Sequence, residues 1–168
     1  MKDDINKMIE LFEISNEMVP DLRFDLEHNF KSEFIRDLRN TSIELDSLSD
    51  AIVIGDGLHR ISYKNVDKFL SVFKYKNKSD WRLPDVKELK SILREIKSKN
   101  IEFIETEFCS STISKRYENS IYTVGYFKIG MRYGAWGVKM AEKIEIAERI
   151  SGDFCYFSLI LVRDKNSK

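Results

Sequence analysis

The chain has 168 residues, of which 42% are hydrophobic and 33% charged, and 28 basic and 28 acidic side chains give it a formal net charge of zero. This composition is typical of a soluble globular protein, and the length fits one domain with an additional helical segment. No apolar run approaches the roughly 20 residues that span a bilayer, which excludes a transmembrane helix. The amino terminus does not resemble an apolar signal segment, so we expect a cytoplasmic protein without membrane partners.

The first part of the chain reads as two amphipathic helices. Residues 3–19 place apolar side chains on one helical face, and a second helix is expected from Asp21 to Leu38. The alternation over residues 22–26 also fits a short strand. Together these segments predict a helical extension over residues 1–46, whose apolar face packs on the rest of the protein, on a second copy or on a partner. The apolar positions are Ile5, Ile9, Phe12, Phe30 and Phe34.

A short apolar run at residues 51–54 predicts a strand. Gly55-Asp56-Gly57 is a strong turn signal, and residues 58–63 can return as the second strand of a hairpin. Asn65 is then expected to cap a helix whose apolar residues extend to Phe73.

The clearest local signal lies at residues 80–89. Pro84 fixes its own φ and pushes the preceding residue into an extended conformation, so no helix runs through this point. Asp85 is free to cap a new helix, and Glu88 stands where the partner of a capping box belongs. The helix should end near Asn100. We expect Trp81 to anchor the turn onto the core, because so large an aromatic side chain is usually buried.

The second half of the chain favours strands. Residues 121–127, 135–140 and 154–163 are rich in aromatic and branched side chains. Residues 130–134 read as a loop, and residues 143–149 fit either a strand or a short helix. Helices first and strands last predict an α+β protein.

The residues that catalysis or metal binding would need are missing. Cys109 and Cys155 have no C-x-x-C spacing and are expected to be free thiols, so neither a metal nor a cofactor is predicted. His28 and His59 lack the neighbours that a catalytic base requires, and no glycine-rich phosphate loop is present. We therefore predict that the protein is not an enzyme.

Basic side chains are concentrated in residues 60–99. Such a stretch can bind nucleic acid, but it can also be a solvated face or a face that docks the acidic N-terminal part. Candidate contact residues here are Lys74, Lys76 and Lys78.

A second candidate surface lies in the segment that begins at Tyr117 and ends at Trp136. Tyrosine, tryptophan and arginine on loops are the residue types of binding hot spots. Arg132 and Tyr133 lie in the expected loop, which is hard to bury, and together with Tyr117 they are the candidate contact residues. Trp136 is expected to be a structural anchor in the core.

Several motifs resemble those of one family in the correct order. Residues 80–84, Asp-Trp-Arg-Leu-Pro, followed by Val-Lys-Glu-Leu at residues 86–89, resemble the signature of the Lcl C-terminal domain family. The Gly-Asp-Gly turn at residues 55–57, residues 108–112 and residues 135–138 resemble further conserved pieces of that family. The motif at residues 81–89 is specific to the family, whereas the other motifs support the resemblance only because they occur together in the same order.

This resemblance implies a C-type-lectin-like fold for residues 47–168, with two helices beside a twisted, mainly antiparallel sheet. Members of the family are mostly small binding modules, displayed outside bacteria or carried by phages. The Glu-Pro-Asn and Trp-Asn-Asp loops of calcium-dependent lectins do not occur here, so binding is expected to be calcium-independent. Leu70 and Leu161 occupy the positions where family members often carry cysteines, which suits a reducing compartment.

The sequence thus predicts a non-catalytic binding protein that recognises another protein through its lectin-like loops and N-terminal helices. One version of this hypothesis is a phage- or mobile-element-encoded inhibitor of a host or defence protein. The alternatives are a homo-oligomeric adhesion or ligand-binding module that associates through residues 1–45, and a nucleic-acid binder that uses the basic residues 64–99. The sequence names neither the partner nor the oligomeric state.

Overall fold

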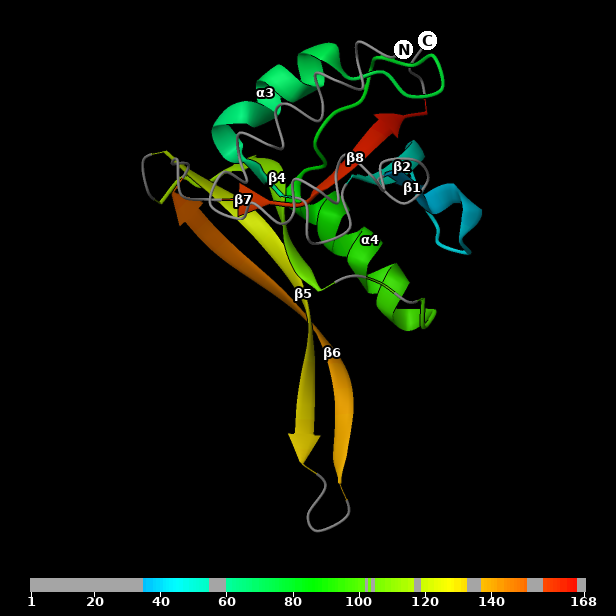
Figure 1. The fold of residues 1–168 in the computed structure, drawn as a ribbon, viewed down its shortest axis with the longest axis vertical. Helices are drawn as coiled ribbons and strands as arrows, with labels where there is room; N and C mark the ends of the chain where they lie inside the picture. The colour runs from blue at the N-terminus through cyan, green and yellow to red at the C-terminus, as the bar shows by residue number, and fades with distance from the viewer. Residues whose placement is uncertain are drawn as a thin grey trace, which may run out of the picture.

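The computed structural model has an α+β fold, as predicted (Figure 1). It describes residues 35–54, 60–101, 103, 105–116, 119–132, 137–150 and 156–165. The helical elements are η1 (Leu38–Asn40), α3 (Tyr63–Val72) and α4 (Val86–Ser98). The strands are β1 (Ile35–Asp37), β2 (Leu48–Ile54), β3 (Ile61–Ser62), β4 (Thr106–Ile113), β5 (Ser120–Arg132), β6 (Val138–Ile150), β7 (Tyr156–Phe157) and β8 (Leu159–Asp164).

The central sheet has the antiparallel strand order β1-β2-β8 and is buried on both faces. Ile52 and Ile54 of β2 point into a core that contains Phe69 of α3. Ala51 and Val53, on the opposite face, join a second core with the buried side of α4. Because side chains alternate along a strand, one apolar run supplies both cores. The two helices therefore cover opposite faces of the central sheet.

The corner before α4 forms as the sequence predicts. Asp85 accepts a hydrogen bond from the Glu88 amide at 2.8 Å, and the Glu88 carboxylate accepts one from the Asp85 amide at 2.9 Å, which completes the capping box. Trp81 is 7% exposed, and its indole N–H donates to the Lys78 carbonyl. Pro84 is buried at the same corner. Asn100 follows α4 with φ of 53°, as expected for a residue that ends a helix.

The predicted helix from Asp21 to Leu38 is wrong at its end. Residues 35–37 form β1, which pairs with β2 through Ile35↔Ile54 and its neighbours, and a single 3₁₀ turn follows. The tertiary partner overrides the helical spacing because the edge of β2 offers these residues backbone hydrogen bonds. Residues 1–34, on which the rest of the extension was predicted, lie outside the described residues.

The predicted hairpin over residues 51–63 is also wrong in its pairing. β2 pairs with β1 and β8, and the returning residues Ile61 and Ser62 pair with β7 instead. The following helix begins at Tyr63 after Ser62, so Asn65 lies inside its first turn and does not cap it. Pairing with strands that are distant in the sequence therefore determines the partners of both β2 and β3.

The second three-stranded sheet has the order β4-β5-β6. It joins the central sheet where the Ser158 amide donates to the Glu107 carbonyl at 3.0 Å. The strands are longer than predicted: residues 130–132 of the expected loop belong to β5, and residues 143–149 are strand in β6. Leu161 belongs to the same core as α3, and the partly buried Leu70 packs against that core.

Candidate interaction surface on the β5–β6 hairpin

Strands β5 and β6 form an antiparallel ladder without a register shift. Thirteen pairs run from Ser120↔Ile150 to Arg132↔Val138. Strand β4 accompanies β5 only as far as the pair Thr106↔Tyr126. From Phe127 onward, no third strand pairs with this hairpin among the described residues. Figure 1 shows the outer half of the hairpin extending well away from the helices and the central sheet.

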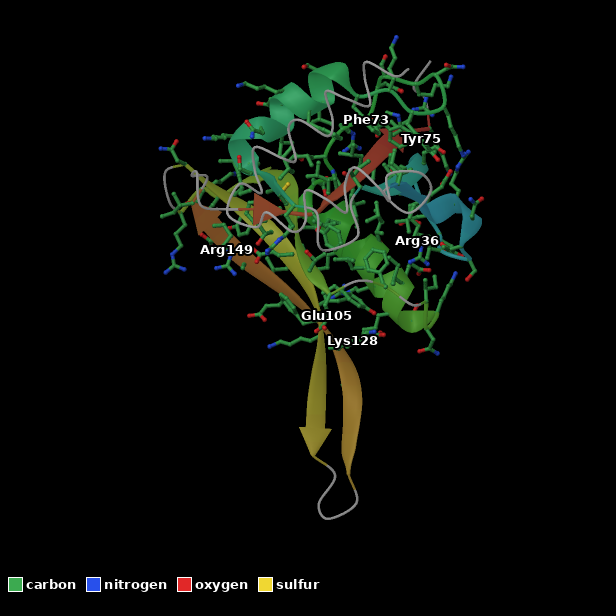
Figure 2. All side chains as sticks on the ribbon, viewed as in Figure 1. Arg36, Phe73, Tyr75, Glu105, Lys128 and Arg149 are labelled. Carbon is green, nitrogen blue, oxygen red and sulfur yellow. The ribbon has the colours of Figure 1, made fainter. Side chains whose placement is uncertain are left out.

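Glu105 holds the hairpin by a hydrogen bond at the point where the hairpin leaves the rest of the protein. A carboxylate oxygen of Glu105 accepts a hydrogen bond from the Lys128 amide at 2.6 Å, and Figure 2 shows the two residues together at this point. Nearer the body, Glu107 accepts from the Thr123 hydroxyl and forms an ion pair with Arg149 at 2.8 Å. Residues of the segment before β4 and of β4 itself thus fix the base of the hairpin.

Gly125 lies in the middle of β5. The Phe127 ring folds back over it, and a Cβ added to Gly125 would stand 2.2 Å from a carbon of that ring. The glycine therefore makes room for an aromatic side chain on the same face of the strand.

A basic groove lies between α4 and the base of β6. Lys90, Arg94 and Lys97 follow each other on one side of α4 at a spacing of four and three residues. They line a hollow of about 460 Å³ together with four residues of β6. The β6 residues are Glu142, Lys143, Ile144 and Ile146.

This basic groove combines a charged rim with an aliphatic floor. Four cations and one carboxylate line it, and Ile146 is 42% exposed. Lys143 has a partner, Glu145, at 3.5 Å. No carboxylate pairs with Lys90, Arg94 or Lys97 among the residues that the structure describes. The groove can therefore accept negative charge and apolar groups together.

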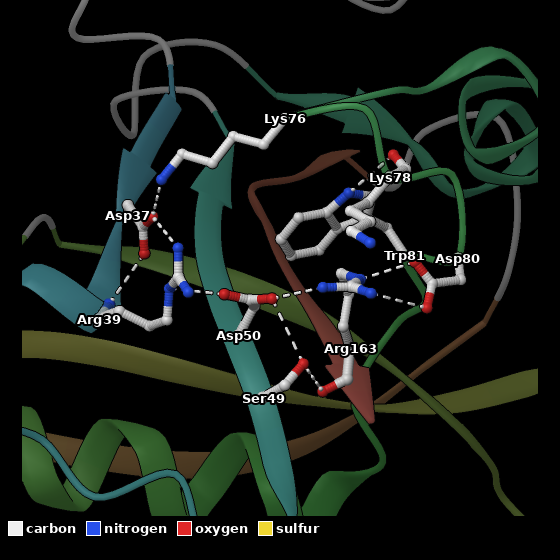
Figure 3. Close-up of polar contacts among 9 residues, drawn as sticks. All are labelled: Asp37, Arg39, Ser49, Asp50, Lys76, Lys78, Asp80, Trp81 and Arg163. Carbon is white, nitrogen blue, oxygen red and sulfur yellow. Dashed lines mark hydrogen bonds and ion pairs between the residues drawn. The ribbon is translucent and has the colours of Figure 1, made fainter. Parts of the chain in front are cut away.

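On the other side of the molecule, a chain of charges joins the loop before α4 to the central sheet (Figure 3). Arg163 of β8 contacts Asp50 of β2 at 2.6 Å and Asp80 of the loop at 2.6 Å. Its guanidinium lies 5.7 Å from the centroid of the Trp81 ring. Arg39 extends the chain, with 2.5 Å to Asp50. These charges are paired with one another, so their role is to hold the loop in place.

The three candidate lysines of this loop do not form one site. Lys74, Lys76 and Lys78 are exposed, but Lys76 forms an ion pair with Asp37 at 2.7 Å (Figure 3). Burial alone would raise the pKa of the Asp37 carboxyl, but hydrogen bonds from Lys76 and Arg39 outweigh it and hold that pKa below its ordinary value. Part of the basic stretch is thus used to bind η1 and its flanking residues.

Of the predicted contact residues, those that the structure describes lie in two separate places. Arg132 is the last residue of β5, in the outer half of the hairpin, whereas the lysine loop lies at the opposite end of the molecule (Figure 1). Tyr117, Tyr133 and Trp136 lie outside the described residues. Sequence reasoning missed the length of the hairpin and the basic groove. The spacing of Lys90, Arg94 and Lys97 was the available signal for the groove.

Cys109 is fully buried in the core, and burial raises the pKa of its thiol to about 12. Among the described residues, no group of three or more His, Cys, Asp or Glu side chains could hold a metal ion. Across the same residues, none of the helices has the length and apolar character needed to cross a membrane. Cys155, His28 and His59 lie outside the described part of the chain.

Comparison with known proteins gives no match: no family model, no curated protein and no solved structure matches this chain. The resemblance to the Lcl C-terminal domain family therefore stays a prediction from the sequence motifs.

Proposed function

We propose that this chain is a non-catalytic protein-binding module whose contact element is the outer half of the β5–β6 hairpin. The observation that carries the proposal is the six register pairs from Phe127↔Lys143 to Arg132↔Val138, which continue beyond β4. A two-stranded hairpin is marginally stable in water by itself, so this extension adds little to the stability of the body. Contact with a partner supplies a physical reason for its length.

The sequence of this outer half suits a protein partner. It contains apolar and cationic residues, and the sequence between its two strands includes a tyrosine and a tryptophan, which are common hot-spot residues. Its unpaired strand edges also offer backbone donors and acceptors to a strand of another chain. The residues concerned are Lys128, Ile129, Met131, Arg132, Tyr133, Trp136, Val138, Lys139 and Met140.

We also infer a C-type-lectin-like fold for the domain. Two features support it: two helices that cover opposite faces of an antiparallel sheet, and the capped corner at Trp81, Pro84 and Asp85. Both agree with what the Lcl resemblance implies.

The test is a shortened hairpin. Residues 129–141 are replaced by Asn-Gly, so that a two-residue turn joins Lys128 to its register partner Glu142. This variant should keep the circular dichroism spectrum and the unfolding midpoint of the wild type. Affinity-tagged wild type and the control variant Lys68→Ala, altered on exposed α3 surface, should retain a stoichiometric partner from the source cells, and the shortened variant should lose it. Retention by the shortened variant, or no stoichiometric partner for the wild type, would refute the proposal.

A further inference from the structure

The charge of the chain is divided between two parts. Residues 1–34 contain nine acidic and four basic side chains, so this segment carries a net charge of −5. Residues 35–168 contain nineteen acidic and twenty-four basic side chains and carry +5. A neutral protein with such a division has a built-in attraction between its N-terminal segment and its body.

Within the described body, the basic groove brings together three cations that have no carboxylate partner, and exposed lysines elsewhere, such as Lys68, Lys74 and Lys78, also lack one there. Lys90, Arg94 and Lys97 have no carboxylate partner there, whereas Lys76, Arg82 and Arg163 are each paired with aspartate or glutamate. A segment rich in carboxylates gains most by lying where cations are still unpaired.

The floor of the groove favours a polypeptide over nucleic acid. Ile144 and Ile146 are aliphatic, and among the described residues no aromatic side chain on which a base could stack lines the hollow. Glu142 would repel a phosphate backbone, whereas a polypeptide can place an uncharged or basic residue beside it. Residues 1–34 carry apolar side chains at helical spacing along with their acids, which matches an aliphatic floor with a cationic rim.

The C-terminal end of this segment joins the described body at residue 35, within reach of the groove. The Arg36 guanidinium lies 5.8 Å from the centroid of the Phe103 ring, and that ring lies 5.7 Å from the Tyr126 ring. Tyr126 is the register partner of Ile144 in the groove floor. Since an extended chain covers about 3.3 Å per residue, 34 residues reach the groove easily.

We propose that residues 1–34 cover the basic groove of the same chain, with their carboxylates against Lys90, Arg94 and Lys97 and their apolar side chains over Ile144 and Ile146. The contact then lies beside the base of the β5–β6 hairpin. The proposal does not depend on the function proposed for that hairpin.

The direct test is zero-length carboxyl–amine cross-linking of the full chain with a carbodiimide, followed by mass spectrometry of the monomer. The ion pair between Lys76 and Asp37, at 2.7 Å, is the internal positive control. Links from Lys90, Lys97 or Lys143 to acidic residues of 1–34 are expected. If the control link forms and the groove lysines link to none of these acids, the proposal fails. A mixture of isotopically light and heavy chains shows whether links join two copies, and links confined to such dimers would overturn it in favour of a second copy.

A charge-swap series tests the same contact by proteolysis. The variant Lys90→Glu/Arg94→Glu/Lys97→Glu should raise the rate of tryptic cleavage after Arg23 about tenfold, since three exposed ion pairs change an equilibrium by about that factor. The control Lys68→Glu/Lys74→Glu/Lys78→Glu makes the same change of charge on exposed residues of α3 and its following loop, and should leave the rate unchanged.

Adding Glu10→Lys/Glu13→Lys/Glu17→Lys to the groove variant should restore slow cleavage. Equal cleavage rates in the groove variant and the wild type would refute the proposal. Binding of a short oligothymidylate to the wild type, lost in the groove variant, would show that the groove is open to nucleic acid and would also refute it.

Discussion

Arg163 and Asp50 form an ion pair of 2.6 Å in which 8% and 9% of the two side chains are exposed. The same guanidinium contacts Asp80 and lies over Trp81, so one side chain of β8 holds both β2 and the loop that leads to α4. Removal of Arg163 takes away the buried cation between Asp50 and Asp80 and leaves Asp50 with the half-exposed Arg39, and breaking a buried pair in this way is costly.

Replacement of this arginine by methionine should therefore be costly. Arg163→Met is expected to lower the free energy of unfolding by about 3–5 kcal/mol. Arg39→Met removes the other cation of Asp50, but that arginine is 46% exposed, so a loss of less than about 1 kcal/mol is expected. Urea unfolding followed by tryptophan fluorescence measures both. Similar small losses for the two variants would contradict the central role of Arg163.

Arg82 makes stability depend on acid pH. Its hydrogen bonds lower the pKa of Glu88 below the ordinary 4.5 and that of Asp164 below the ordinary 3.8. The unfolded state therefore binds protons more readily, so this stabilisation is complete above about pH 4.5 and is lost as the pH falls through the lowered values. Arg82→Gln should reduce the slope of the free energy of unfolding against pH below 4.5, although Asp37 still contributes to that slope. Lys68→Gln, at an exposed lysine of α3, should leave the slope unchanged, and an unaltered slope in Arg82→Gln would contradict the assignment.

The Asp85 cap should make its own contribution to the free energy of unfolding, which a single substitution can measure. Asp85→Ala removes the acceptor for the Glu88 amide and should lower the free energy of unfolding by about 1 kcal/mol. Asp85→Asn keeps an acceptor oxygen and should cost only a fraction of that. Thermal unfolding by circular dichroism compares the two, and an equal loss in both variants would argue against the cap as the cause.

Gly125 and Phe127 should be energetically coupled. Gly125→Ala places a methyl group at 2.2 Å from a ring carbon of Phe127, so the ring must move. The expected cost is about 1–3 kcal/mol, typical of overpacking. In the background Phe127→Ala, the same glycine substitution should cost much less. A double-mutant cycle in urea measures the coupling, and additive losses would show that the ring does not constrain this position.

Cys109 should be inert in the folded protein. Its thiol is fully buried, and burial raises its pKa to about 12, so the thiolate that reacts with alkylating reagents is scarce. In a Cys155→Ser variant, iodoacetamide should label Cys109 slowly under native conditions and rapidly in urea. Fast labelling of the folded protein would contradict this burial.

Local signals explain what the sequence could predict. The proline at 84, the cap at 85 and the partner at 88 act through the backbone of their immediate neighbours, so α4 begins and ends as predicted. The buried strand at residues 51–54 could also be predicted, because burial follows from pattern and composition. The candidate contact lysines at 74, 76 and 78 are exposed, but sequence spacing could not show that Asp37 pairs with Lys76.

The chain by itself therefore determined an α+β composition, a capped and proline-bounded α4, and an excess of acid before residue 35. Only the tertiary structure decided that residues 35–37 are a strand, that Ile61 pairs with Phe157, and that β5 and β6 continue beyond β4. The physical reason is that strand pairing joins residues far apart in the chain. The hydrogen bonds that stabilise this pairing are made by the backbone, so the local sequence does not show which strands pair. The basic groove arises in the same way, because its two walls, α4 and β6, are brought together only by folding.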